Sequence, residues 1–191
     1  GDDYNSDAAM FDLVHEMRAR IMTCEAFDNE RVLGAILFED TMEREVNGKS
    51  TANYLWEEKN IVPFLKVDKG LAEQMNGVQV MRPIPDLDQL LDKAKNYPVF
   101  GTKMRSVIYE PSVDGIELVV QQQFDVAKQI ISKGLMPIVE PEVDINSSKK
   151  HECEVMLKIS ILQNLDRLTD DQQVMLKLTL PEEAGFYQEL I

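Results

Sequence analysis

The stretch Met136-Pro-Ile-Val-Glu-Pro-Glu-Val143 decides the fold that this sequence predicts. It is an apolar, β-branched run with two acidic residues, Glu140 and Glu142, placed two positions apart near its end. Residues two apart in a β-strand point to the same face of the sheet. The stretch therefore predicts a strand that carries charge on one face, near its carboxyl end, and apolar residues on the other face.

Four more short apolar runs predict strands elsewhere in the chain, and longer segments with apolar residues at helical spacing separate them. The further strands are expected over residues 33–38, 61–68, 99–106 and 173–180. The helices are expected over residues 7–22, 51–60, 86–95, 116–133 and 149–168. No two-residue hairpin turn joins one of these strands to the next, so the alternation indicates βαβ units and a parallel sheet.

Charged residues stand near the ends of four successive predicted strands. They are Lys66 and Asp68, Lys103 and Arg105, Glu140 and Glu142, and Lys177. An open sheet covered by helices on both faces has little room for such charges, whereas the mouth of a (β/α)8 barrel collects them. Neither common nucleotide-binding glycine motif follows a strand. The sequence thus predicts an α/β fold, a (β/α)8 TIM barrel, with residues 1–191 forming a single domain.

The composition of the chain limits which binding partners and which cellular compartment we expect. The formal net charge of −14 argues against nucleic acids and anionic membranes as partners. No apolar run reaches the roughly 18–20 residues of a membrane span, and the acidic N-terminus is unlike a signal peptide. Cys24 and Cys153 are expected to be reduced, half-buried thiols. We therefore expect a cytoplasmic protein.

The predicted mouth contains lysines, an arginine and carboxylates, but no histidine or cysteine. His15 and His151 both fall in predicted helices, without a metal-ligand partner at useful spacing. This argues against a zinc site and against hydrolysis by a serine–histidine–acid triad. We expect no metal and no cofactor.

A lysine in such a mouth can act as a nucleophile toward a carbonyl group. Burial and a neighbouring cation both favour the neutral amine that attacks a carbonyl carbon. Lys177 is the best-placed candidate, and Glu140 or Glu142 could move the protons that imine formation requires. Lys103 and Arg105 could bind an anionic substrate. The residues indicate a Schiff-base lyase that acts on a phosphorylated carbonyl compound.

Several of these stretches resemble class I fructose-1,6-bisphosphate aldolase, in its short bacterial form. They are Ile36-Leu-Phe38, Phe64-Leu-Lys-Val-Asp-Lys-Gly70, Lys103-Met-Arg105, Pro137-Ile-Val-Glu-Pro-Glu142 and Val174-Met-Leu-Lys-Leu-Thr-Leu180. The resemblance runs from about Asp7 to Ile191. It implies reversible cleavage of fructose 1,6-bisphosphate into dihydroxyacetone phosphate and glyceraldehyde 3-phosphate, a metal-independent step of glycolysis.

The resemblance also implies a role for each charged residue of the predicted mouth. Lys177 would form the imine, Glu140 would be the main general acid and base, and Glu142 would support it. Lys103 would contact the substrate around the carbon that is cleaved, and Arg105 would help to hold a phosphate. The remaining two, Lys66 and Asp68, would line the same mouth and orient these groups.

The resemblance leaves parts of the family's barrel outside this sequence. The family's first strand, with a catalytic aspartate, would precede Gly1, and its last two strands would follow Ile191. The five predicted strands would then be about strands two to six of eight. On this reading the segment alone is expected to be unstable, to associate through its open edges as a homo-oligomer, or to be the ordered part of a longer chain. Its activity alone is expected to be impaired.

Two alternatives stay open from the sequence. One is another Schiff-base enzyme, such as a deoxyribose-phosphate or keto-acid aldolase or a transaldolase. The other is a non-catalytic fragment that uses an aldolase-derived surface for binding. Substrate profiling separates the first alternative, and a test for a covalent lysine adduct separates the second.

Overall fold

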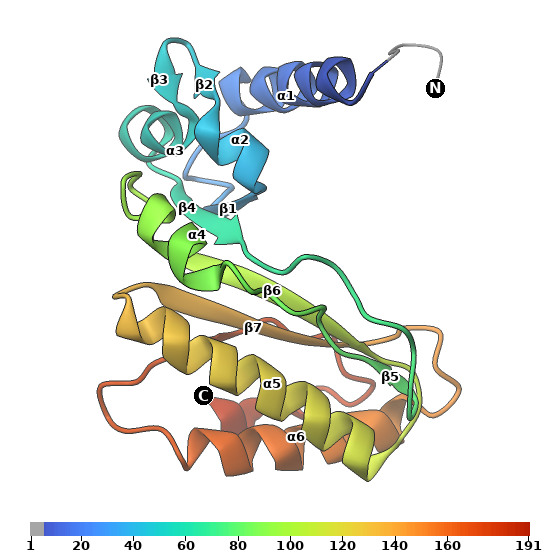
Figure 1. The fold of residues 1–191 in the computed structure, drawn as a ribbon. Helices are drawn as coiled ribbons and strands as arrows, with labels where there is room; N and C mark the ends of the chain where they lie inside the picture. Colours follow the sequence, from blue (N-terminus) through green and yellow to red (C-terminus); the bar gives the residue numbers. More distant parts are fainter. Residues whose placement is uncertain (1–5) are drawn as a thin grey trace. The chain divides into compact units, whose positions relative to one another are not determined.

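The computed structural model describes residues 6–191 (Figure 1). The chain divides into two compact units. Among the described residues, the first unit contains residues 6–66 together with 88–101, and the second contains residues 67–87 and 102–191.

The first unit is built on two parallel strands. β1 (Gly34–Leu37) pairs with β4 (Val62–Lys66), with Gly34 opposite Val62 and Leu37 opposite Leu65. Leu65 of β4 and Ile61, which directly precedes this strand, are fully buried. α1 (Asp7–Thr23) begins at Ser6, whose hydroxyl oxygen accepts a hydrogen bond from the amide of Ala9, a usual N-cap. α2 (Glu39–Glu43) follows β1 directly, and α4 (Leu87–Ala94) buries Leu90 and Leu91.

A small hairpin belongs to the same unit. β2 (Glu45–Val46) and β3 (Lys49–Ser50) pair antiparallel around Asn47 and Gly48, both with positive φ, at 52° and 78°. This turn matches the Asn-Gly preference of two-residue hairpin loops. α3 (Thr51–Asn53) continues into a π-helical turn, η1 (Tyr54–Glu58).

The second unit contains the strands that carry most of the predicted mouth. β6 (Gly101–Ile108), β7 (Met136–Val143) and β8 (Met175–Leu176) lie in that order. β7 and β8 are parallel, with Ile138 opposite Met175 and Val139 opposite Leu176. β5 (Val78–Gln79) pairs antiparallel with the end of β6.

Two long helices pack in this unit, side by side in Figure 1. α5 (Val113–Ser132) contacts β7 and α6 (Lys150–Leu165), and its buried stripe includes the fully buried Val119, Phe124 and Ile130. The hydroxyl oxygen of Ser112 accepts a hydrogen bond from the amide of Gly115 and begins α5. A 3₁₀ turn, η2 (Gln188–Leu190), follows β8 near the end of the chain.

The predicted α/β alternation is confirmed, with two corrections. A strand is present inside or across each of the five predicted strand segments, and the five predicted helical segments are helical over most of their length. The sheet is mostly rather than wholly parallel, because β5 is antiparallel. The last strand, expected over residues 173–180, is only two residues long, because regular pairing with β7 ends after Leu176. The described strands do not close into a barrel within either unit.

Candidate active site

The two faces of β6 and β7 differ in chemistry, as the alternation of charged and apolar residues predicted. Lys103 and Arg105 of β6 and Glu140 and Glu142 of β7 project from one face and pair across the two strands. The opposite face of β6 packs on α5, where the hydroxyl of Ser106 accepts a hydrogen bond from the fully buried Gln123. Strand pleating therefore separates the charged side chains from the helical layer.

The carboxylate of Glu140 lies between two lysine ammonium groups. Lys177 Nζ donates a hydrogen bond to Glu140 Oε1, and Lys103 Nζ lies 3.0 Å from Glu140 Oε2. The side chains of Glu140 and Lys103 are 5% and 11% exposed, whereas that of Lys177 is 54% exposed. Lys177 is thus the member of this cluster that a molecule from solvent reaches first. The Glu140 carboxylate and the Lys103 ammonium group are more deeply buried.

Buried hydrogen bonds fix the backbone under Glu140. The amide of Glu140 donates to Gln123 Oε1 at 2.8 Å, and Gln123 Nε2 donates to Ser106 Oγ at 3.1 Å. One side chain of α5 thereby ties β6 to β7 behind the charged face. A functional side chain keeps a defined geometry when buried hydrogen bonds fix the backbone that carries it.

A second pair continues the cluster along the strands. Arg105 Nη1 lies 3.3 Å from Glu142 Oε2, and both side chains are partly exposed, at 43% and 35%. The guanidinium group presents several further N–H donors, which suits it to bind a carboxylate or phosphate.

The remaining two predicted residues are Lys66, the last residue of β4, and Asp68, two positions later. Asp68 is buried in the second unit, where its Oδ1 accepts a hydrogen bond from the amide of Gly70 at 3.2 Å. The preceding residue, Val67, donates its amide to the carbonyl of Lys103 at 3.0 Å. Lys66 ends β4 in the first unit, with Nζ 5.5 Å from the ring centroid of Phe38. That Lys66 and Asp68 line the same mouth stays a prediction.

Gln123 and Thr179 contribute to this site although the sequence analysis did not single them out. Gln123 lies on the buried stripe of α5, where a polar residue among apolar ones is itself a signal of a buried hydrogen bond. Thr179 Oγ1 accepts from the amide of Val143 at 3.2 Å and donates to its carbonyl at 2.9 Å.

The two cysteines differ in burial. Cys24 is exposed at the end of α1, so the expectation that it is half-buried was wrong: the helix ends there and leaves it uncovered. Cys153 is buried in α6. Neither forms a disulfide. Over residues 6–191, no group of three or more histidine, cysteine or acidic side chains is arranged to hold a metal ion. Among the helices of that range, none is both long and apolar enough to span a membrane.

Solved structures resemble this fold. Fructose-bisphosphate aldolase from Plasmodium falciparum, solved in a complex with TRAP and a small-molecule inhibitor, superposes with a TM-score of 0.69 at 23% identity. The match covers 91% of this chain and 57% of that one, so the chain spans little more than half of that aldolase. An arginine decarboxylase of Paramecium bursaria Chlorella virus, bound to agmatine, reaches a TM-score of 0.41 at 13% identity, over 65% of this chain and 36% of that one.

The sequence itself gives the family. The family model described as "Fructose-bisphosphate aldolase class-I" matches residues 13–183, nearly the whole chain. That range contains all seven charged residues that the sequence analysis selected, and the solved aldolase above has the same α/β fold. The chain therefore belongs to the class I fructose-bisphosphate aldolase family.

Proposed function

We propose that this chain cleaves fructose 1,6-bisphosphate reversibly into dihydroxyacetone phosphate and glyceraldehyde 3-phosphate, with Lys177 forming a Schiff base. The observation that carries the proposal is the cluster in which Lys177 and Lys103 share the carboxylate of Glu140. A half-exposed amine in contact with a buried carboxylate has a nucleophile and a proton acceptor already within reach of each other. Membership of the aldolase family supports the same reaction.

The proposed chemistry assigns each proton to a group of the cluster. Glu140 takes a proton from the Lys177 ammonium, and the neutral amine adds to the C2 carbonyl carbon of the ketose. The resulting carbinolamine loses its hydroxyl as water, with a proton supplied by Glu140, and leaves an iminium ion. Glu140, again a carboxylate, then accepts the proton of the C4 hydroxyl as the C3–C4 bond breaks, which releases the aldehyde and leaves an enamine on Lys177.

The second half of the reaction restores the enzyme. Glu140 gives that proton to C3 of the enamine, which forms the iminium ion of dihydroxyacetone phosphate, and hydrolysis by water releases this product and restores the amine of Lys177. Lys103 stays beside Glu140 in this scheme, at 3.0 Å, and compensates the carboxylate charge each time a proton leaves it. No step requires a metal, which suits a site made of lysines and carboxylates.

The proposed substrate contacts extend along β6 and β7. Lys103 contacts the substrate near the carbon that is cleaved, and Arg105 takes part in holding a phosphate with its free N–H donors. Glu142 orients Arg105 at 3.3 Å and supports Glu140. Lys66 and Asp68 complete the mouth. We further propose that the enzyme acts in glycolysis in the cytoplasm and forms a homo-oligomer.

A cleavage assay with a matched pair of lysine variants tests the proposal. Lys177→Met removes the nucleophile, and Lys149→Met makes the same change at an exposed lysine of α6's N-cap. We expect Lys177→Met to lower kcat for fructose 1,6-bisphosphate by about 10⁴-fold or more, because covalent catalysis is lost. Lys149→Met should keep the wild-type rate.

Substrate profiling separates the related enzymes. We expect fructose 1,6-bisphosphate to be cleaved with a higher kcat/KM than deoxyribose 5-phosphate or a 2-keto-3-deoxy acid. A preference for either of the latter would assign the chain a different aldol substrate. Full activity of Lys177→Met would exclude the proposed nucleophile.

A further inference from the structure

We infer that Lys150 and Glu154 of α6 act as positioning residues for Lys177, by holding the chain segment that follows β8. The inference rests on the proposed function for its catalytic consequence. Its structural part, that this pair fixes the backbone that carries Lys177, stands on the geometry alone. Neither residue touches the charged cluster itself.

The strand directly before Lys177 has little support of its own. β8 pairs regularly over only Met175 and Leu176, and its sole neighbour in the described sheet is β7. Lys177 adds one further backbone bond, from its amide to the carbonyl of Val139 at 3.0 Å. A short strand at a sheet edge frays readily unless other contacts fix it. The Lys177 side chain can hold its place beside Glu140 only if the residues after it are held as well.

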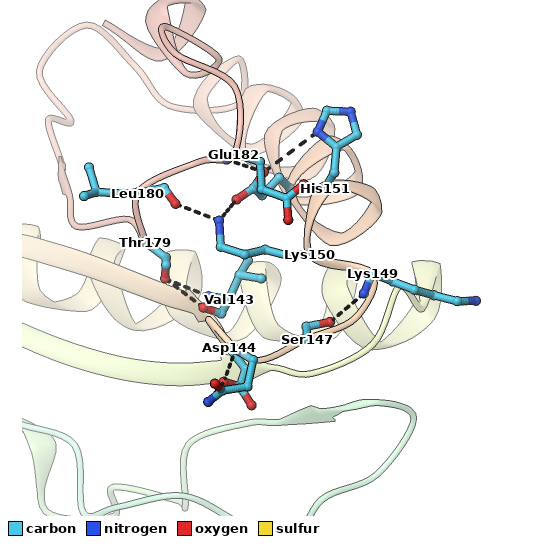
Figure 2. A network of polar contacts seen from close by, with 11 residues as sticks. Val143, Asp144, Ser147, Lys149, Lys150, His151, Thr179, Leu180 and Glu182 are labelled. Atoms are coloured by element: carbon cyan, nitrogen blue, oxygen red, sulfur yellow. Dashed lines mark hydrogen bonds and ion pairs between the residues drawn. The ribbon is translucent and has the colours of Figure 1, made fainter.

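The first attachment after Lys177 is Thr179. Its hydroxyl both accepts from the amide and donates to the carbonyl of Val143, the last residue of β7 (Figure 2). A side chain thus replaces the backbone pairing that ends at Leu176. This keeps the segment against β7 on the side of Glu140 and Glu142.

The second attachment is the buried ion pair of α6. Lys150 Nζ donates a hydrogen bond to Glu154 Oε1. It also donates one to the carbonyl of Leu180 at 2.7 Å (Figure 2). The other oxygen of the carboxylate, Glu154 Oε2, accepts from the amide of Glu182 at 3.2 Å. The two charged side chains therefore hold backbone groups on both sides of Pro181. The start of α6 thereby holds the segment after β8 in place.

The burial of this pair argues for a geometric role rather than a stabilising one. The side chains of Lys150 and Glu154 are 9% and 0% exposed. Desolvation offsets most of the attraction within such a pair, so apolar residues of similar size often stabilise a protein equally well. Apolar residues, however, cannot bind the carbonyl of Leu180 or the amide of Glu182. Those two directed contacts are what the pair contributes here.

His151 and Lys149 flank Lys150 but make neither of these two backbone contacts. His151 Nδ1 lies 3.9 Å from Glu154 Oε2, too far for a hydrogen bond, and its side chain is about half exposed. Lys149 precedes the pair and is exposed, and its side chain points away from the network in Figure 2. The lysine at position 149 therefore provides a matched control for the lysine at position 150.

A double variant with a matched control tests the inference. Lys150→Met with Glu154→Leu removes both contacts and leaves no buried charge. Lys149→Met with Glu152→Leu makes the same substitutions at exposed positions of the same helix turn. Thermal melting establishes that each variant is folded. Amide hydrogen exchange then reports on the backbone, and the rate of borohydride trapping with dihydroxyacetone phosphate reports on Lys177.

In the test variant, we expect the Lys177 amide to exchange about tenfold faster than in the wild type, because two hydrogen bonds after it are lost. The Glu140 amide, which Gln123 holds from α5, should keep its exchange rate. Trapping at Lys177 should slow by about the same factor. The control variant should match the wild type in all three measurements.

The outcomes separate this inference from the proposed function. Unchanged exchange of the Lys177 amide in the folded test variant would overturn the positioning role, whatever the trapping result. Absence of trapping in the wild type would overturn the Schiff-base proposal, and the exchange data would still decide the positioning role.

If the first variant does not fold, Lys150→Met with Glu154→Gln decides instead. This variant is neutral and keeps an oxygen for the Glu182 amide. It should accelerate exchange of the Lys177 amide by a smaller factor, about threefold. No acceleration would overturn the inference.

Discussion

Glu140 is the residue on which the charged cluster depends, because both lysines contact its carboxylate and its amide is tied to α5. Its place could be predicted from the sequence, since the spacing of Glu140 and Glu142 in an apolar run puts both on one strand face. The contact with two lysines, one in β6 and one directly after β8, could not be predicted from spacing. It depends on the register of β6 and β8 against β7, which local patterns do not encode.

Replacing Glu140 by glutamine tests its proposed role as a proton carrier. Glu140→Gln keeps the shape of the side chain but cannot exchange a proton, so kcat for fructose 1,6-bisphosphate should fall by about 10²- to 10⁴-fold. The matched variant Glu142→Gln changes a more exposed carboxylate that contacts Arg105, and should lower kcat less. Steady-state kinetics measures both. Equal losses would contradict the assignment of Glu140 as the main acid and base.

The two cysteines should differ in reactivity. Burial raises the pKa of the Cys153 thiol, so less of the reactive thiolate is present and reagents have little access. Cys24 is exposed. At pH 8 we expect iodoacetamide to modify Cys24 at least tenfold faster than Cys153 in the native protein, and both at similar rates in denaturant. Peptide mapping by mass spectrometry measures this. Rapid native modification of Cys153 would contradict the packing of α6.

At the scale of elements, α5 links the helical layer to the charged face. Its buried stripe includes Val119, Val120, Ala127 and Ile130, and helical spacing puts Gln123 among them. The sequence therefore contained a signal for a buried polar contact at this position. It did not indicate the partners, Ser106 of β6 and the amide of Glu140, because these lie far away in the chain.

The substitution Gln123→Leu tests that link. It leaves the Glu140 amide and the Ser106 hydroxyl buried without their partner, and should lower the free energy of unfolding by about 1–3 kcal/mol. The control Gln163→Leu, at an exposed position of α6, should change it by less than about 0.5 kcal/mol. Urea denaturation followed by circular dichroism measures both. An unchanged stability of Gln123→Leu would mean that this contact does not hold the strands.

Element types could be predicted further than element lengths. The five main strands and the helices between them follow from apolar periodicity. The β2–β3 hairpin was not among the predicted elements, although Asn47-Gly48 is a known signature of such turns and both residues have positive φ angles. The shortness of β8 has no such signal. Residues 173–180 alternate like a strand throughout, but beyond Leu176 the backbone is held through Thr179 and Lys150 instead of by regular pairing.

At the scale of the whole molecule, the family match and the fold agree. The family model covers residues 13–183, and the Plasmodium falciparum aldolase superposes over 91% of this chain. The predicted α/β barrel fold is confirmed in this form, as a mostly parallel arrangement that does not close within either unit. That residues 1–191 form a single domain stays a prediction. In a chain with a formal net charge of −14, the cluster combines the cations of Lys103, Arg105 and Lys177 with the carboxylates of Glu140 and Glu142, which suits the anionic substrate that we propose.

Borohydride reduction in the presence of dihydroxyacetone phosphate is the most direct test of the central claim. We expect a single covalent adduct by intact mass, mapped by peptide sequencing to Lys177, and no adduct without borohydride or with Lys177→Met. Lys149→Met should form the adduct at the wild-type rate. An adduct on a different lysine, or none on folded protein, would contradict the assignment of Lys177 as the Schiff-base nucleophile.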